Sequence, residues 1–341
     1  MTNIDEKNQP LGLKKIIEDV LSLIISTLKE NGQTDEQIEE LMSSEEFDEI
    51  YVKLIDKFIE DTTTNITQNI HEYDKEELAS NAQDLNYIQS VWGNAFSYLR
   101  IFYVMCLDIC EEYRQFVNEE KYLFDRPSVA QALYFIHAKS MLVYAETICL
   151  LENGYPDGAI AHWRTLFELY AIAVFLNDNN DDVSKEYINS FNDKSNDEQS
   201  KYKWARKSGR FAEEKGIGIS AIISEMYKIL KEQGTIDISK KKFLDGYNFA
   251  NLILHPSAKG VFGRVSNLQE VNSIAVGRSD YGLDVAAINS VTVLYEITVL
   301  HLAMFPSAIS YIGINLLRNI WKDNIEPEIN SIRSQFIQED S

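Results

Sequence analysis

The stretch Ala159-Ile-Ala-His-Trp-Arg-Thr-Leu-Phe-Glu-Leu-Tyr-Ala-Ile-Ala-Val-Phe175 decides the fold class. Apolar residues occupy almost every position, and Tyr155-Pro156-Asp157-Gly158 places a proline where a helix would begin. A helix that is apolar almost all round has to be covered by other helices. Two of its polar residues, Arg164 and Glu168, are four apart and share one face, so we expect them to form an ion pair.

Outward from this stretch, apolar residues recur at helical spacing along nearly the whole chain. The spacing predicts one helix or two nearly continuous ones over 74–120, and a last helix kinked at Pro306. The other predicted helices begin near Leu13, Thr34 and Ser44, or span about 127–151, 156–175, 183–191, 197–215, 220–233 and, for the last one, 284–322. Strand-like alternation is confined to 261–275, which fits a long loop equally well. The sequence therefore predicts an all-α fold, a helical bundle with long antiparallel helices plus an N-terminal helical module.

Composition excludes several classes of protein. The 341 residues contain 15 Gly and 6 Pro, too few for the frequent turns of a barrel or sandwich, and 45% hydrophobic residues exclude a disordered chain. The chain opens without a signal-peptide pattern, and its most apolar window, 300–317, is interrupted by polar residues and by Pro306. Cys106 and Cys110 lack further ligands at zinc spacing. We therefore expect a cytoplasmic protein with no membrane span, no metal and no cofactor.

The net charge of −21 is unevenly distributed. Residues 1–126 carry 11 basic and 27 acidic side chains, whereas residues 127–341 carry 21 and 26. This shift, together with the turn at Arg126-Pro127, predicts an acidic helical module over 1–126 and a helical bundle over 127–341. An acidic chain repels phosphate overall, so the imbalance restricts where RNA could bind. The acidic module is predicted either to face a basic protein partner or to screen the basic segment at 201–210.

Two sets of residues could carry chemistry. Arg164 and Glu168 form either a structural ion pair or part of a site. His255 lies between an apolar helical segment and Pro256, so it is a general acid, a histidine hydrogen-bonded to Glu168, or a residue that caps the helix. Ser257 in the following turn is a candidate binding residue.

Two further segments could bind an anion. Lys201 to Phe211 carries five positive charges and no acid, and on a helix Lys203, Lys207 and Arg210 would share one face suited to phosphate. An ordinary solvated face is the alternative. Gly277-Arg278-Ser279-Asp280-Tyr281-Gly282 forms a turn before the last helix, where Arg278 and Asp280 are candidate binding residues.

The other histidines, His71, His137, His162 and His301, are dispersed along the sequence. The chain has no glycine-rich phosphate loop, no dinucleotide fingerprint and no zinc-protease or nucleophile-elbow motif.

Three elements in order carry a resemblance to a known family. They are Glu152-Asn-Gly-Tyr-Pro-Asp-Gly-Ala159 followed by Trp163-Arg-Thr-Leu-Phe-Glu168, then Leu254-His-Pro-Ser257, then Gly277-Arg-Ser-Asp-Tyr-Gly282. Residues 127–302 thereby resemble the bacterial domain of unknown function 5677, which looks like the HEPN-like helical proteins of toxin–antitoxin and abortive-infection systems. Active members of that group are metal-free ribonucleases that use an arginine and a histidine separated by four to six residues, usually across a dimer interface. No arginine of this chain has a histidine at that spacing.

Two hypotheses remain open. In the first, the protein is an RNA-directed effector in which Arg164 stabilises phosphorane charge, His255 transfers protons and Glu168 orients them. In the second, it is a non-catalytic binding or scaffold protein in which the same polar residues are structural. In both, apolar helix surface beyond what one small bundle covers predicts a homodimer.

Overall fold

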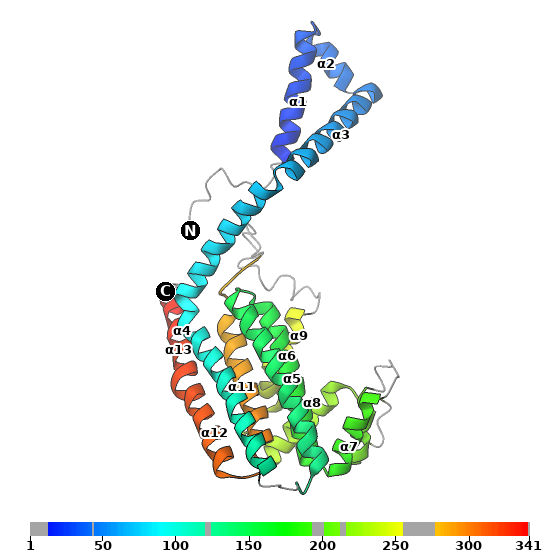
Figure 1. Ribbon diagram of the computed structural model, residues 1–341. Coiled ribbons are helices and arrows are strands. Elements are labelled where there is room, and N and C mark those ends of the chain that lie inside the picture. The colour runs from blue at the N-terminus through cyan, green and yellow to red at the C-terminus, as the bar shows by residue number, and fades with distance from the viewer. Residues whose placement is uncertain are drawn as a thin grey trace. The chain divides into compact units, whose positions relative to one another are not determined.

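The protein is all-α, as the sequence predicts (Figure 1). The computed structural model describes residues 13–42, 44–119, 124–192, 201–211, 216–254 and 277–339, and these ranges contain no strand. They form two compact units that divide between Asn81 and Ala82. Each unit is described by itself below.

The first unit contains α1 (Leu13–Glu30), α2 (Asp35–Met42), α3 (Glu45–Gln68) and the start of α4 (Ile70–Glu119). The Ser44 side chain caps α3 by accepting a hydrogen bond from the Phe47 amide. Among the described side chains, only a few apolar ones are buried here, including Ile24, Ile38 and Phe47. The described part of this unit therefore has a small core.

The second unit is built around α5 (Pro127–Glu152), α6 (Pro156–Asp178) and α11 (Leu283–Leu302), which pack against one another and against the rest of α4. Further elements surround them: α7 (Asp181–Asn189), η2 (Ser190–Asn192), η3 (Lys203–Ser208), α8 (Ile219–Glu232), α9 (Lys240–Leu254), α12 (Ala308–Asn319), η4 (Ile320–Ile325) and α13 (Glu326–Glu339). Helix α6 is apolar on nearly all sides because α5, α8, α9 and α11 all pack against it. This confirms the burial that its sequence predicts.

Reciprocal caps join the ends of α5 and α6. The Asp181 carboxylate accepts hydrogen bonds from the backbone amides of Ser128 and Val129 at 2.7 and 3.0 Å, in the first turn of α5. Arg126 donates to the carbonyl oxygens of Asn177 and Asn179 at the end of α6, at 2.6 and 3.3 Å. Both helices begin with a proline, Pro127 in α5 and Pro156 in α6, as the sequence predicts.

Two predicted helices are wrong. The last helix is not merely kinked at Pro306: α11 ends at Leu302, and α12 begins at Ala308 behind a Ser307–Ser310 capping box. The capping box and the missing amide of Pro306 together favour a full break. The predicted helix over 197–215 is a short 3₁₀ helix at 203–208 within the described residues 201–211, since Gly209 has a φ of 76° and ends it.

The compact units do not divide where the charge shifts. Residues 82–119 of α4 belong to the second unit because Trp92, Phe96 and Phe102 are buried in its core. The boundary at Arg126-Pro127 stays a prediction about the sequence modules.

Helices α6 and α11 are long and apolar enough to cross a membrane. Their most apolar windows are 67% and 56% buried inside the bundle, and the core helices of a soluble protein pass the same test.

Candidate functional site

Arg164 and Glu168 form the predicted ion pair on α6, and Tyr247 of α9 joins it. The Arg164 Nη2 atom lies 3.0 Å from Glu168 Oε1, and the Tyr247 hydroxyl donates to the same oxygen at 2.9 Å. The Arg164 guanidinium carbon also lies 5.7 Å from the centre of the Tyr247 ring. We call these three residues the Arg164 cluster.

The Arg164 cluster is half-buried rather than fully enclosed. The side chains of Arg164 and Glu168 are 31% and 24% exposed. Burial acts to lower the pKa of Arg164, but Tyr247 and the Glu168 carboxylate outweigh it and raise that pKa above its usual value. Burial and the negative charge of Glu168 raise the pKa of Tyr202 to about 12. Arg164 therefore remains charged, and Tyr202 and Tyr247 remain neutral, near neutral pH.

Close packing holds α6 and α9 together beside the cluster. A Cβ atom on Gly246 would lie 3.1 Å from the Trp163 ring, so only glycine lets the helices approach this closely without displacing that ring. Phe167 packs its ring against Phe243 and Tyr247, at centroid distances of 5.8 and 5.4 Å. These contacts set the spacing between α6 and α9 beside the cluster.

His255 and Ser257 lie outside the described residues. Helix α9 ends at Leu254, the residue before His255. An approach of His255 to Arg164 in space therefore stays a prediction.

The basic segment does not form the predicted helical face. Lys203 and Lys207 are exposed, but Arg210 is bound to Asp178 and lies 3.6 Å from Glu225. Its guanidinium also lies over the Phe175 ring at 6.0 Å. Two lysines thus remain available to phosphate, while Arg210 links η3 to α6 and α8.

The turn at 277–282 packs onto the connection between α5 and α6. The Ser279 amide donates to the Gly154 carbonyl oxygen at 2.9 Å, and the Arg278 guanidinium lies 5.4 Å from the Tyr155 ring. Asp280 accepts a hydrogen bond from the Tyr87 hydroxyl at 3.3 Å. Two motif elements more than a hundred residues apart in sequence therefore meet in space. Their contacts connect the segments that directly precede α6 and α11.

A histidine pair is the main feature that the sequence does not reveal. His137 of α5 and His301 of α11 are buried and stack with ring centroids 5.3 Å apart. The His137 Nε2 atom lies 3.1 Å from Thr298 Oγ1 and 3.7 Å from Cys110 Sγ. The only sequence signal is that Thr298 and His301 share a helix face, which does not identify His137 as their neighbour.

The described residues around this pair do not provide the three ligands that a metal site usually needs. Within the described part of the chain, no three His, Cys, Asp or Glu side chains are grouped so that they could hold a metal ion. Burial raises the pKa of the Cys110 thiol to about 12, which disfavours the thiolate that a metal requires.

Comparison with known proteins adds one relationship. Residues 130–264 match the model of DUF5677, a family of unknown function, which confirms the resemblance to that domain over these residues. The matched residues include Arg164, Glu168, Tyr247 and His255, while His301 lies beyond them. No curated protein and no solved structure matches the chain significantly.

Proposed function

We propose that this protein acts by binding rather than by catalysis, with the Arg164 cluster as a clamp between α6 and α9. One observation carries the proposal: Glu168 Oε1 accepts a hydrogen bond from Tyr247 and also forms the ion pair with Arg164. A general base has to present its oxygen to the substrate proton, and an arginine that stabilises a phosphorane has to face the phosphate. Here the Arg164 guanidinium and the Glu168 carboxylate bind each other, so neither is directed at a substrate.

The proposed partners follow from the surfaces of the two units. Residues 1–81 carry 7 basic and 20 acidic side chains, so a basic protein is the partner that this unit would attract. In the second unit, Ile101, Val104, Phe135 and Leu142 are large apolar side chains on α4 and α5 that are at least half exposed. They support a homo-oligomer. The burial of α6 and α11 supports a chain without membrane spans, and a cytoplasmic location is part of the same proposal.

An RNA-directed effector of anti-phage defence or toxin–antitoxin type is the second candidate function. It is favoured by Arg164, whose side chain is a third exposed and whose buried Nε atom has no hydrogen-bond partner among the described residues. His255 would supply the proton transfer, since it directly follows α9, the helix that carries Tyr247. Lys203 and Lys207 would contact the RNA backbone. This activity would be that of a metal-free ribonuclease.

The two candidates separate in an RNA-cleavage assay with the purified full-length chain. We expect the wild type to leave end-labelled single-stranded and structured RNA intact at enzyme excess. Expression of the wild type should likewise leave growth and total RNA unchanged. Arg164→Ala should lower the free energy of unfolding without changing either readout.

Cleavage that is present in the wild type and lost in both Arg164→Ala and His255→Ala would overturn the binding proposal. Arg318→Ala is the matched control, since Arg318 lies on α12 outside the cluster. Cleavage lost in this variant as well would indicate general misfolding, and cleavage retained in all variants would indicate a contaminating nuclease. A salt titration of RNA binding with Lys203→Glu and Lys207→Glu tests the phosphate contacts separately.

A further inference from the structure

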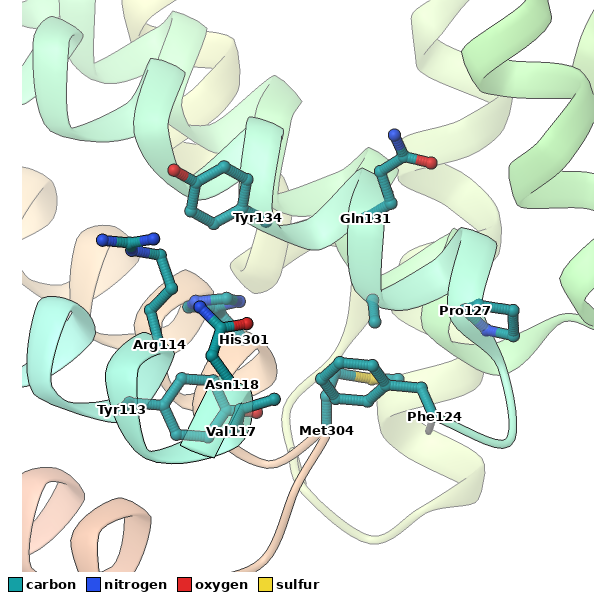
Figure 2. A pocket seen from close by; sticks show the side chains of 11 residues that line it. Tyr113, Arg114, Val117, Asn118, Phe124, Pro127, Gln131, Tyr134, His301 and Met304 are labelled. Atoms are coloured by element: carbon teal, nitrogen blue, oxygen red, sulfur yellow. The ribbon is translucent and has the colours of Figure 1, made fainter. Parts of the chain in front are cut away.

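The second unit contains a pocket with a volume of about 390 Å³ (Figure 2). The end of α4, the start of α5 and the end of α11 enclose it. This volume lies within the range of sites that hold small organic molecules. Every helix that lines the pocket belongs to the part of the chain that also forms the main core.

The inner wall of the pocket carries a buried histidine whose polar atoms are unused. His301 is 6% exposed, and neither of its ring nitrogens has a hydrogen-bond partner within the described residues. Its ring lies between those of Tyr113 and Tyr134, at centroid distances of 5.3 and 5.8 Å (Figure 2). A buried polar group without a partner is unfavourable, so such a group facing a pocket indicates a ligand that would satisfy it.

The charge of the pocket restricts the class of ligand. Among the described lining residues, Arg114 alone has a permanent charge, and Glu111 pairs with it through two hydrogen bonds of 2.9 and 2.7 Å. Burial lowers the pKa of His301 to about 4, so the imidazole is neutral near pH 7 and offers one donor and one acceptor. The described lining residues therefore offer no unpaired charge that would attract a charged ligand.

The remaining surface favours a flat apolar body. Val117, Phe124 and Met304 form an apolar side, and the tyrosine rings on either side of His301 offer faces and edges to an aromatic ring. Asn118 and Gln131 are exposed lining residues and therefore lie at the opening.

We propose that this pocket binds a small uncharged aromatic molecule with an N–H or O–H group, which donates a hydrogen bond to His301. Phenols and indoles are the simplest members of this class. The pocket is separate from the Arg164 cluster, which is formed by other residues of the same unit. Bound ligand would join α4, α5 and α11 at one end of the bundle.

The test uses the full-length chain and four probes: indole, phenol and their methylated forms, 1-methylindole and anisole. Ligand-observed NMR and calorimetry would give each dissociation constant. We expect the parent probes to bind the wild type about tenfold more tightly than the methylated forms, which lack the donor. Tenfold corresponds to about 1.4 kcal/mol, within the range of one hydrogen bond.

Variants decide whether His301 is the partner. His301→Phe should weaken the parent probes about tenfold and leave the methylated probes unchanged. Asn118→Trp, at an exposed position that leaves the core intact, should block all four probes by filling the opening. His162→Phe is the matched control, because His162 lies on α6 beside Glu146, away from the pocket, and should bind like the wild type.

Three results would overturn the proposal. The first is no binding of any probe to the wild type up to millimolar concentration. The second is equal affinity of the parent probes for the wild type and His301→Phe. The third is binding that Asn118→Trp leaves unchanged, since that would place the probes elsewhere on the chain.

Discussion

At the scale of single residues, one oxygen atom holds the Arg164 cluster together. Glu168 Oε1 receives both the Tyr247 hydroxyl and the Arg164 guanidinium, which approach from α9 and α6. The two contacts depend on each other, because the carboxylate can accept from both donors only while the helices keep their spacing. Hydrogen bonds to a charged acceptor are stronger than neutral ones.

Tyr247→Phe isolates the contact between the helices. Removing the hydroxyl should lower the free energy of unfolding by about 1–2 kcal/mol, because Glu168 loses a donor in a half-buried position. Urea denaturation followed by circular dichroism measures the change. Tyr311→Phe is the control, since Tyr311 is 72% exposed and should change stability by less than about 0.5 kcal/mol. Equal effects of the two changes would contradict the clamp.

The buried histidines predict a dependence of stability on pH. Burial lowers the pKa of His301 to about 4, and burial followed by the charge of His301 lowers the pKa of His137 to about 3. The unfolded chain takes up these protons near pH 6.5, so stability is fully present above that pH. It falls as the pH drops toward 4, by roughly 1.4 kcal/mol per pH unit for each histidine.

Urea midpoints of the wild type and His301→Phe between pH 7 and pH 5 test this dependence. The variant should lose stability less steeply than the wild type. The side chains that contact the pair from neighbouring helices are Cys110, Tyr113 and Tyr134, and Arg114 lines the same pocket as His301. Burial raises the pKa of the Cys110 thiol to about 12, so this thiol does not ionise between pH 5 and pH 7. Parallel slopes for the two proteins would show that His301 does not drive the loss.

At the scale of elements, periodicity predicts a helix well wherever packing follows the same pattern. Helices α5 and α6 begin at the prolines that the sequence indicates and end within three residues of the prediction. The pattern fails at Pro306 and Gly209, where apolar residues continue but the backbone changes direction. A loop can bury apolar side chains as well as a helix does: Phe211 lies just beyond η3 and is 2% exposed.

Asp181→Ala tests the cap that joins α5 to the start of α7. The change removes the acceptor of two backbone amides in the first turn of α5, so stability should fall by about 1 kcal/mol. Asp182→Ala is the matched control, because Asp182 is the next residue, is exposed and lies in the same turn of α7. Thermal and urea unfolding should show a clear loss only for Asp181→Ala.

Gly154→Ala and Gly209→Ala separate backbone strain from crowding. Both glycines have a φ above 70°, so alanine is strained by about 1 kcal/mol at either position. Only at Gly154 would the new Cβ meet other atoms, with Ile88 at 2.5 Å and Arg278 at 3.2 Å. Gly154→Ala should therefore be the more destabilising by about 1–3 kcal/mol in urea titrations. Equal losses would mean that the side chains of Ile88 and Arg278 make room for the new Cβ at no cost in stability.

At the scale of the whole molecule, the sequence predicts the site only where its residues are close along one helix. Arg164 and Glu168 are such a pair, and the structure confirms their contact. Tyr247 and the His137–His301 pair escape prediction because their partners come from other helices. The charge shift predicts a boundary at Arg126-Pro127, whereas packing gives one between Asn81 and Ala82. The two differ because acidic side chains lie on the surface, while the core is formed by apolar side chains such as Trp92 and Phe96.

Chains that begin at Ala82 and at Pro127 would distinguish those two boundaries. The chain from Ala82 keeps the α4 side chains of the main core, so it should unfold cooperatively and give a near-ultraviolet circular dichroism signal from packed aromatic rings. The chain from Pro127 lacks Trp92, Phe96 and Phe102, which are at most 2% exposed. Losing each costs about 3–5 kcal/mol, and together they exceed much of a domain's usual stability of about 5–15 kcal/mol. That chain should therefore lack fixed tertiary packing, and equal stability of the two chains would place the structural boundary at the charge shift instead.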